Sequence, residues 1–119
     1  MNHAVAFTAY IVVSSVFSLM LTYAIALDVM RNKSVLVMMS KLGVPESWLP
    51  MLAALKAAGA LGLLVGIGVT FVGVAGATGL VVFFLGAIVT HLRARDSVLG
   101  PTAFLVPAVS ALVLRLVSM

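Results

Sequence analysis

The sequence predicts an all-α membrane protein that folds as a bundle of four transmembrane helices. Of its 119 residues, 64% are hydrophobic and 8% are charged, whereas about a quarter of the residues in a soluble domain are charged. The mean hydropathy is +1.31. The charged residues lie between long uncharged segments. A membrane-spanning helix needs roughly 20 consecutive apolar residues. We therefore expect a single transmembrane domain over residues 1–119.

Charge and cysteine content narrow the function classes. The net charge is +4, but the basic residues are scattered near the ends of the apolar runs and form no tract, which argues against nucleic-acid binding. The chain has no cysteine, which excludes disulfides, thiol redox chemistry and cysteine-ligated iron–sulfur clusters in this chain.

The first predicted span covers residues 4–27, which carry no charge. A cleaved signal peptide would need a positively charged start, and "MNH" contains no lysine or arginine. Residues 28–50 follow as a connection with five charges and two prolines. We expect this connection to touch the membrane surface through "SVLVMM" and Trp48, because tryptophan favours the interface.

Residues 51–92 are long enough for two spans joined by a tight turn. We place the turn in "TFVGVAGAT", residues 70–78, where glycines and β-branched residues weaken a helix. The second and third spans are then expected at 51–70 and 75–92. A fourth span is expected at 101–117, with Pro101 at its first position and Pro107 inside it.

The basic residues predict the orientation in the membrane. The connections after the first and third spans hold five of the seven: Arg31, Lys33, Lys41, Arg93 and Arg95. The positive-inside rule then places these connections in the cytoplasm and both termini outside.

Several ionisable side chains are predicted to gather at the end of the bundle that carries these connections. Lys56 lies within the second span, where it either extends to the near interface or faces the interior, paired with Asp28 or placed near His91. His91 either marks the end of a span or handles protons inside the bundle. Asp28 and Tyr23 complete the candidate ligand-binding or proton-handling group.

The remaining polar residues and the glycines have structural interpretations. Arg93, Arg95, Asp96 and Arg115 are expected to anchor helix ends, with Arg115 extending to the interface. No metal site is predicted, because the only other histidine, His3, belongs to the opposite end. One face of the second span is expected to pack closely against another helix, in the same chain or in a second copy, through Gly59, Gly62 and Gly66.

Three segments resemble the DoxX-like family of small four-helix bacterial membrane proteins. They are "KLGVPESWLPMLAALKAAGALGLLVG" (41–66), "GAIVTHLRARD" (86–96) and "VLRL" (113–116). The resemblance implies a four-helix protein of the bacterial plasma membrane. Some relatives are linked to quinone-coupled oxidation of sulfur compounds, as a small subunit of a thiosulfate:quinone oxidoreductase, and others to oxidative-stress membrane complexes. Many relatives are expected to carry a carboxylate where this chain has Lys56.

Three functions remain open from the sequence. The first is an accessory or binding protein for a lipophilic ligand, such as a quinone or a lipid, or for a membrane partner. The second is a subunit of a quinone-linked membrane oxidoreductase that receives electrons from a redox partner, since this chain has no cofactor ligands of its own. The third is a small transporter, although the first span lacks the carboxylate that proton-coupled cation export needs. We expect no reaction from the chain alone.

Overall fold

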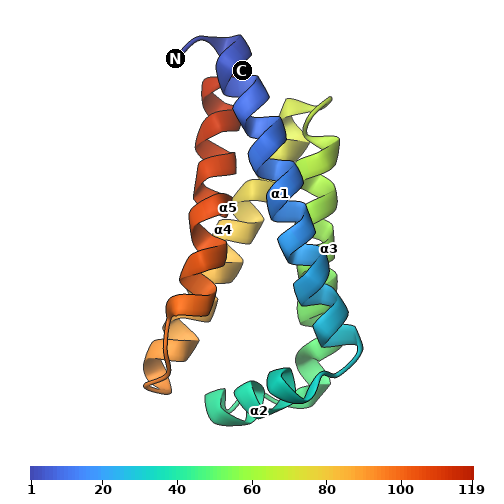
Figure 1. Cartoon of the computed structure of the whole chain (residues 1–119), viewed down its shortest axis with the longest axis vertical. Coiled ribbons are helices and arrows are strands. Elements are labelled where there is room, and N and C mark those ends of the chain that lie inside the picture. The colour runs from blue at the N-terminus through green and yellow to red at the C-terminus, as the bar shows by residue number, and fades with distance from the viewer.

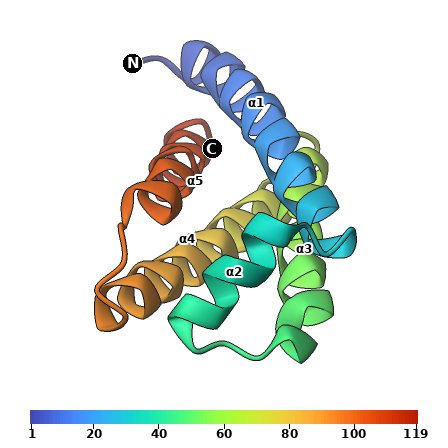
Figure 2. The same cartoon turned by 60° about the horizontal axis from the view of Figure 1, so that its bottom comes forward.

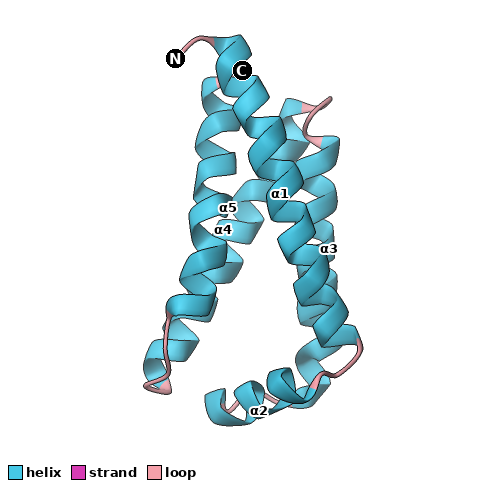
Figure 3. Cartoon of the chain, viewed as in Figure 1, coloured by secondary structure: helices cyan, strands magenta, loops and turns pink.

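The computed structural model describes all 119 residues, and they form helices joined by short loops, with no strand (Figure 3). The elements in chain order are α1 (His3–Val29), α2 (Lys33–Leu42), the short 3-10 helix η1 (Glu46–Trp48), α3 (Leu49–Val65), α4 (Thr70–Arg93) and α5 (Leu99–Val117). Four segments are long and apolar enough to cross a membrane: His3–Val29, Glu46–Val65, Thr70–Arg93 and Leu99–Val117. The predicted fold class, an all-α bundle of four spanning helices, is confirmed.

The four long helices form a ring in which α1 packs on α3, α3 on α4, α4 on α5, and α5 back on α1. Figure 1 shows both chain termini at one end, which we call the terminal end together with the α3–α4 turn. We call the opposite end, which carries α2 and the α4–α5 connection, the basic end. The two helix pairs α1/α3 and α4/α5 diverge towards the basic end, where α2 lies across the bundle (Figures 1 and 2).

The connection predicted at residues 28–50 contains a helix of its own. Asn32 caps α2 by accepting a hydrogen bond from the Ser34 backbone N–H, and Gly43 ends it in the left-handed conformation, φ 73°. On its inner face Val35 and Met39 pack with Leu49 in a small apolar cluster. The amphipathic part of this connection is therefore attached to the bundle.

The turn between the second and third spans lies at residues 66–69, so its prediction at 70–78 was wrong. Gly73 and Gly76 lie inside α4, where they allow close contact between helices. A Cβ atom added to Gly62 would meet the Cα atom of Gly76 at 3.0 Å, and one added to Gly66 would collide with Gly73. The glycines in this run serve helix packing, which sequence patterns alone do not separate from a turn.

The predicted packing role of the α3 glycines is fulfilled within the chain. Besides the contacts of Gly62 and Gly66, a Cβ atom on Gly59 would meet the side chain of Leu80 at 2.5 Å. Small residues let helices approach closely in lipid, where association depends on van der Waals contact. The partner of this glycine face is α4 of the same chain.

The core has an aromatic cluster on the basic side of the glycine contact. The rings of Phe84 and Phe104 stack with centroids 5.2 Å apart, and Phe17 meets Phe104 edge-on at 6.2 Å. Phe83 adds a further edge-on contact with Phe84 at 5.0 Å. These rings fill the space between the diverging helix pairs.

Candidate functional site at the basic end

A buried ion pair joins α1 to α3 near the basic end. Lys56 Nζ lies 2.6 Å from Asp28 Oδ2, and the two side chains are 13% and 7% exposed. Asp28 faces inward because it shares the α1 face of Leu21, seven residues earlier. The structure thus places Lys56 in the interior, paired with Asp28, which is the second of the two alternatives for this residue.

The ion pair borders the aromatic cluster. Lys56 Nζ lies 5.8 Å from the ring centroid of Phe83, within the range of a cation–π interaction. Such an interaction adds to the pairing with Asp28, because the ring face carries partial negative charge. A charge in a membrane interior is costly unless it is paired, so this arrangement makes the lysine tolerable there.

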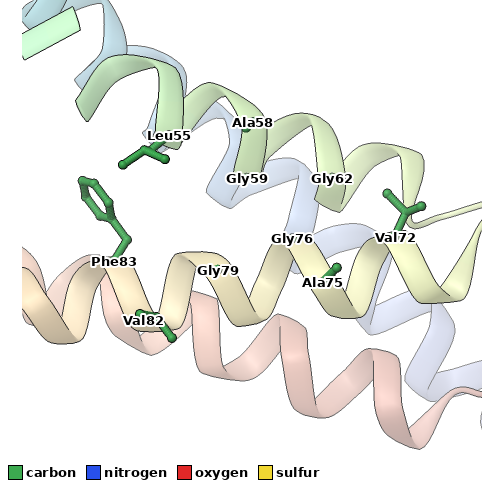
Figure 4. A pocket seen from close by; sticks show the side chains of 10 residues that line it. All are labelled: Leu55, Ala58, Gly59, Gly62, Val72, Ala75, Gly76, Gly79, Val82 and Phe83. Carbon is green, nitrogen blue, oxygen red and sulfur yellow. The ribbon is translucent and has the colours of Figure 1, made fainter. Parts of the chain in front are cut away.

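Phe83 also lines an apolar crevice between α3 and α4 (Figure 4). The crevice has a volume of about 540 Å³, and no charged residue lines it. Figure 4 shows Leu55 and Phe83 facing one another at one end, with the glycine contact of Gly62 and Gly76 further along. One ring therefore contacts both the crevice and the lysine of the ion pair.

His91 forms a separate pair with the α4–α5 connection. Its side chain is 10% exposed, and Nδ1 lies 3.2 Å from Asp96 Oδ2. The two atoms are close, but Nδ1 has no hydrogen-bond partner, because their relative direction does not meet the requirements of a bond. Lys41 of α2 approaches the other carboxylate oxygen of Asp96 at 3.7 Å.

The surroundings of Asp96 favour its charged form. The Ser97 backbone N–H lowers the pKa of the Asp96 carboxyl below its ordinary value, Lys41 and His91 lower it further, and partial desolvation opposes them. No hydrogen bond or ion pair joins His91 to Lys56 or Asp28. The single cluster expected from the sequence is therefore two pairs, one inside the bundle and one at its edge.

Tyr23 does not belong to either pair. Its side chain points outward from α1 and is 68% exposed, so it does not share the interior with Asp28 and Lys56. Hydropathy gives no information on which way an almost uniformly apolar helix is rotated. Arg93 and Arg95 are exposed at the end of α4, where the sequence predicts helix-end anchors, and Asp96 lies beside them.

Arg115 is buried, so the prediction that it extends to the interface was wrong. It is 5% exposed and donates hydrogen bonds to the Gly66 carbonyl at 2.9 Å, to Thr70 Oγ1 at 2.8 Å and to Ser118 Oγ at 3.0 Å. Its guanidinium also lies 5.0 Å from the ring centroid of Phe7. The guanidinium thus connects α1, the α3–α4 turn and α5 at the terminal end.

The end of α3 explains why a cation is stable there. The last carbonyls of a helix lack intrahelical donors and carry partial negative charge. No backbone N–H donates to the carbonyls of Leu63 and Gly66. Instead, the Tyr10 hydroxyl donates to Leu63 at 2.7 Å, and Arg115 donates to Gly66.

Sequence reasoning missed Tyr10, which is fully buried. The only signal in the sequence is one more hydroxyl in the first span, among Thr8, Ser14 and Ser15.

The structure contains no group of three or more His, Cys, Asp or Glu side chains placed to hold a metal ion. Comparison with known proteins gave one match. The model of the DoxX-like family matches residues 12–117, which is nearly the whole chain. No curated protein and no solved structure matches the sequence. Together with the four spanning helices, this match shows that the chain belongs to the DoxX-like family and is a multi-pass integral membrane protein.

Proposed function

We propose that the protein is an accessory or binding protein that holds a lipophilic ligand at the basic end of the bundle. The observation that carries this proposal is the position of Phe83, whose ring centroid lies 5.8 Å from Lys56 Nζ and which also lines the α3–α4 crevice. An apolar crevice beside a buried charged pair provides the two environments that an amphiphilic ligand needs.

The chemistry of the two regions sets the ligand class. The crevice accepts a hydrocarbon or isoprenoid chain, because all of its lining is apolar or glycine. The polar head needs oxygen acceptors, since the ammonium of Lys56 offers only donors. A quinone and a phospholipid both fit this description.

A quinone-linked oxidoreductase subunit is the second candidate, and His91 favours it. A quinol releases protons when it is oxidised, and the buried Nδ1 of His91 makes no hydrogen bond and lies 3.2 Å from Asp96 Oδ2. Proton transfer to this nitrogen would give an imidazolium stabilised by the nearby Asp96 carboxylate. The electrons would go to a partner protein, and this role differs from the first by requiring that partner.

A variant of the ion pair tests the proposed site. The double substitution Asp28→Leu with Lys56→Met removes both charges and keeps the apolar volume, so the bundle is expected to fold. Native mass spectrometry of protein gently extracted from its own membrane would identify bound lipids and quinones. We expect a specific ligand in the wild type and its loss from the double variant.

The crevice is tested separately by Ala58→Phe, which fills it from an exposed position on α3. Lys33→Met serves as the control, because it removes an exposed cation far from the crevice. If Ala58→Phe and the double variant keep the same bound molecules as the wild type, the proposed site is wrong. A stoichiometric quinone together with a copurifying redox protein would support the second candidate instead.

We also propose that the basic end faces the cytoplasm. All five exposed lysine and arginine side chains lie there, and the one arginine at the terminal end, Arg115, is buried. Because the chain has no cysteine, single cysteines report orientation cleanly. Gly68→Cys is expected to react with an impermeant maleimide in intact cells, and Ser97→Cys only in inverted vesicles. The reverse pattern would contradict the proposed orientation.

A further inference from the structure

Three exposed cations lie where the end of α2 meets the α4–α5 connection, and we call Lys41, Arg93 and Arg95 the basic corner. Lys41 comes from the end of α2, while the two arginines end α4 and begin the α4–α5 connection. Asp96 is the only carboxylate that pairs here, and it does so with Lys41 at 3.7 Å and His91 at 3.2 Å. Arg93 and Arg95 have no carboxylate partner, so the corner keeps a net positive charge.

The backbone at Arg95 makes this residue a convenient position for a test variant. Arg95 adopts a left-handed conformation, φ 54°, as the second residue after α4, and Arg31 does the same after α1, φ 53°. Glycine is the usual residue for this conformation, because a side chain there brings Cβ close to the backbone. A glycine at position 95 therefore removes the cation without adding strain.

The depth of the corner points to the headgroup region of the bilayer. The side chains of Val89, Leu92 and Leu99 are exposed on the surface of the spanning helices beside it. These apolar side chains require hydrocarbon around them, and the exposed arginines begin where this apolar surface ends. Arginine forms bidentate hydrogen bonds with phosphate oxygens, whereas the choline of a zwitterionic headgroup repels it.

We propose that the basic corner is a binding site for the headgroup of an anionic phospholipid. The phosphodiester lies between the guanidinium groups of Arg93 and Arg95, and Lys41 adds attraction from α2. Binding there would link the α4–α5 connection to α2 through one lipid. This site is distinct from the α3–α4 crevice and does not depend on the function proposed above.

The test is a titration of purified protein with phosphatidylglycerol and with phosphatidylcholine of the same chain length, followed by native mass spectrometry. The wild type is expected to prefer phosphatidylglycerol, and the preference is expected to weaken in high salt. Arg95→Gly relieves the left-handed backbone, so thermal stability is expected to stay equal or rise while the preference falls about five-fold. Adding Arg93→Gln is expected to reduce it by a further factor of about five.

Lys33→Gln is the matched control, because it removes one exposed cation from the same end of the molecule, at the opposite end of α2 from Lys41. It is expected to change the preference less than Arg95→Gly does. The proposal is overturned if the wild type binds both lipids equally, if Arg95→Gly keeps the full preference, or if Lys33→Gln lowers it as much. The single glycine variant keeps the test valid even if the double variant fails to fold.

Discussion

The two ends of the bundle each bury a cation, but they neutralise it in different ways. At the terminal end, Arg115 meets carbonyl and hydroxyl oxygens where the helices are in close contact. At the basic end, Lys56 meets the carboxylate of Asp28 where the helix pairs diverge. The first arrangement satisfies the end of a helix and holds four helices together. The second places a removable pair of charges beside an apolar crevice, which is why we assign binding to that end.

The largest expected effect comes from breaking the charge pair on one side only. Asp28→Leu leaves Lys56 buried without its partner and is expected to lower the free energy of unfolding by about 3–5 kcal/mol. The double variant with Lys56→Met is expected to lie within about 1 kcal/mol of the wild type or above it. Denaturation in mixed micelles is measured for the wild type, Asp28→Leu, Lys56→Met and the double variant. It gives the free energy of unfolding of each. Equal losses in the single and double variants would show that the apolar volume matters more than the charges.

The helix contact near the terminal end is tested by two glycine substitutions in its neighbourhood. Gly66→Ala places a Cβ atom against the backbone of Gly73 and 2.6 Å from the Tyr10 hydroxyl. We expect a loss of about 3 kcal/mol, because a packed backbone cannot move away. Gly79→Ala meets nothing within 4 Å and is expected to raise stability by up to about 1 kcal/mol through helix propensity. A similar loss in both variants would contradict the close contact seen at Gly66.

The guanidinium geometry is tested by Arg115→Lys, which keeps the charge. One ammonium cannot reproduce the separate bonds to Gly66 and Thr70. We expect a loss of about 1–3 kcal/mol in the free energy of unfolding. If the Arg115→Lys variant is as stable as the wild type, then a positive charge at the end of α3 is sufficient for stability and the forked geometry of the guanidinium is unimportant.

The smallest expected effect concerns pH at the edge of the basic end. The pKa of the Asp96 carboxyl is lowered in the folded protein. The charged carboxylate therefore makes its full contribution to the free energy of unfolding above the ordinary carboxyl pKa. The contribution is lost as the pH falls through the lowered pKa. The stability difference between the wild type and Asp96→Asn is therefore expected to shrink as the pH falls below the ordinary carboxyl pKa. Melting curves across this range measure it, and a difference that grows in acid would contradict the lowered pKa.

The spans and the Asp28–Lys56 pairing were within reach of the sequence, because both depend on charge. Uncharged runs mark membrane helices, and a lysine inside one requires a partner that only a few carboxylates can supply. The failures concern rotation and close contact. Tyr23 and Tyr10 stand in equally apolar surroundings, yet one faces outward and the other caps α3. Arg115 was misassigned for the same reason, because the carbonyls it binds become its neighbours only when the helices are assembled.

The capping of α3 also has a consequence for the order in which the helices assemble. Of the two donors to the carbonyls of Leu63 and Gly66, Tyr10 precedes α3 in the chain, whereas Arg115 lies 49 residues after Gly66 and is synthesised later than α3. Until α5 is inserted, the end of α3 has only Tyr10 to satisfy it. An assembly intermediate with three inserted helices would thus lack the guanidinium that binds the Gly66 carbonyl and Thr70, and this contact forms only when the fourth helix packs.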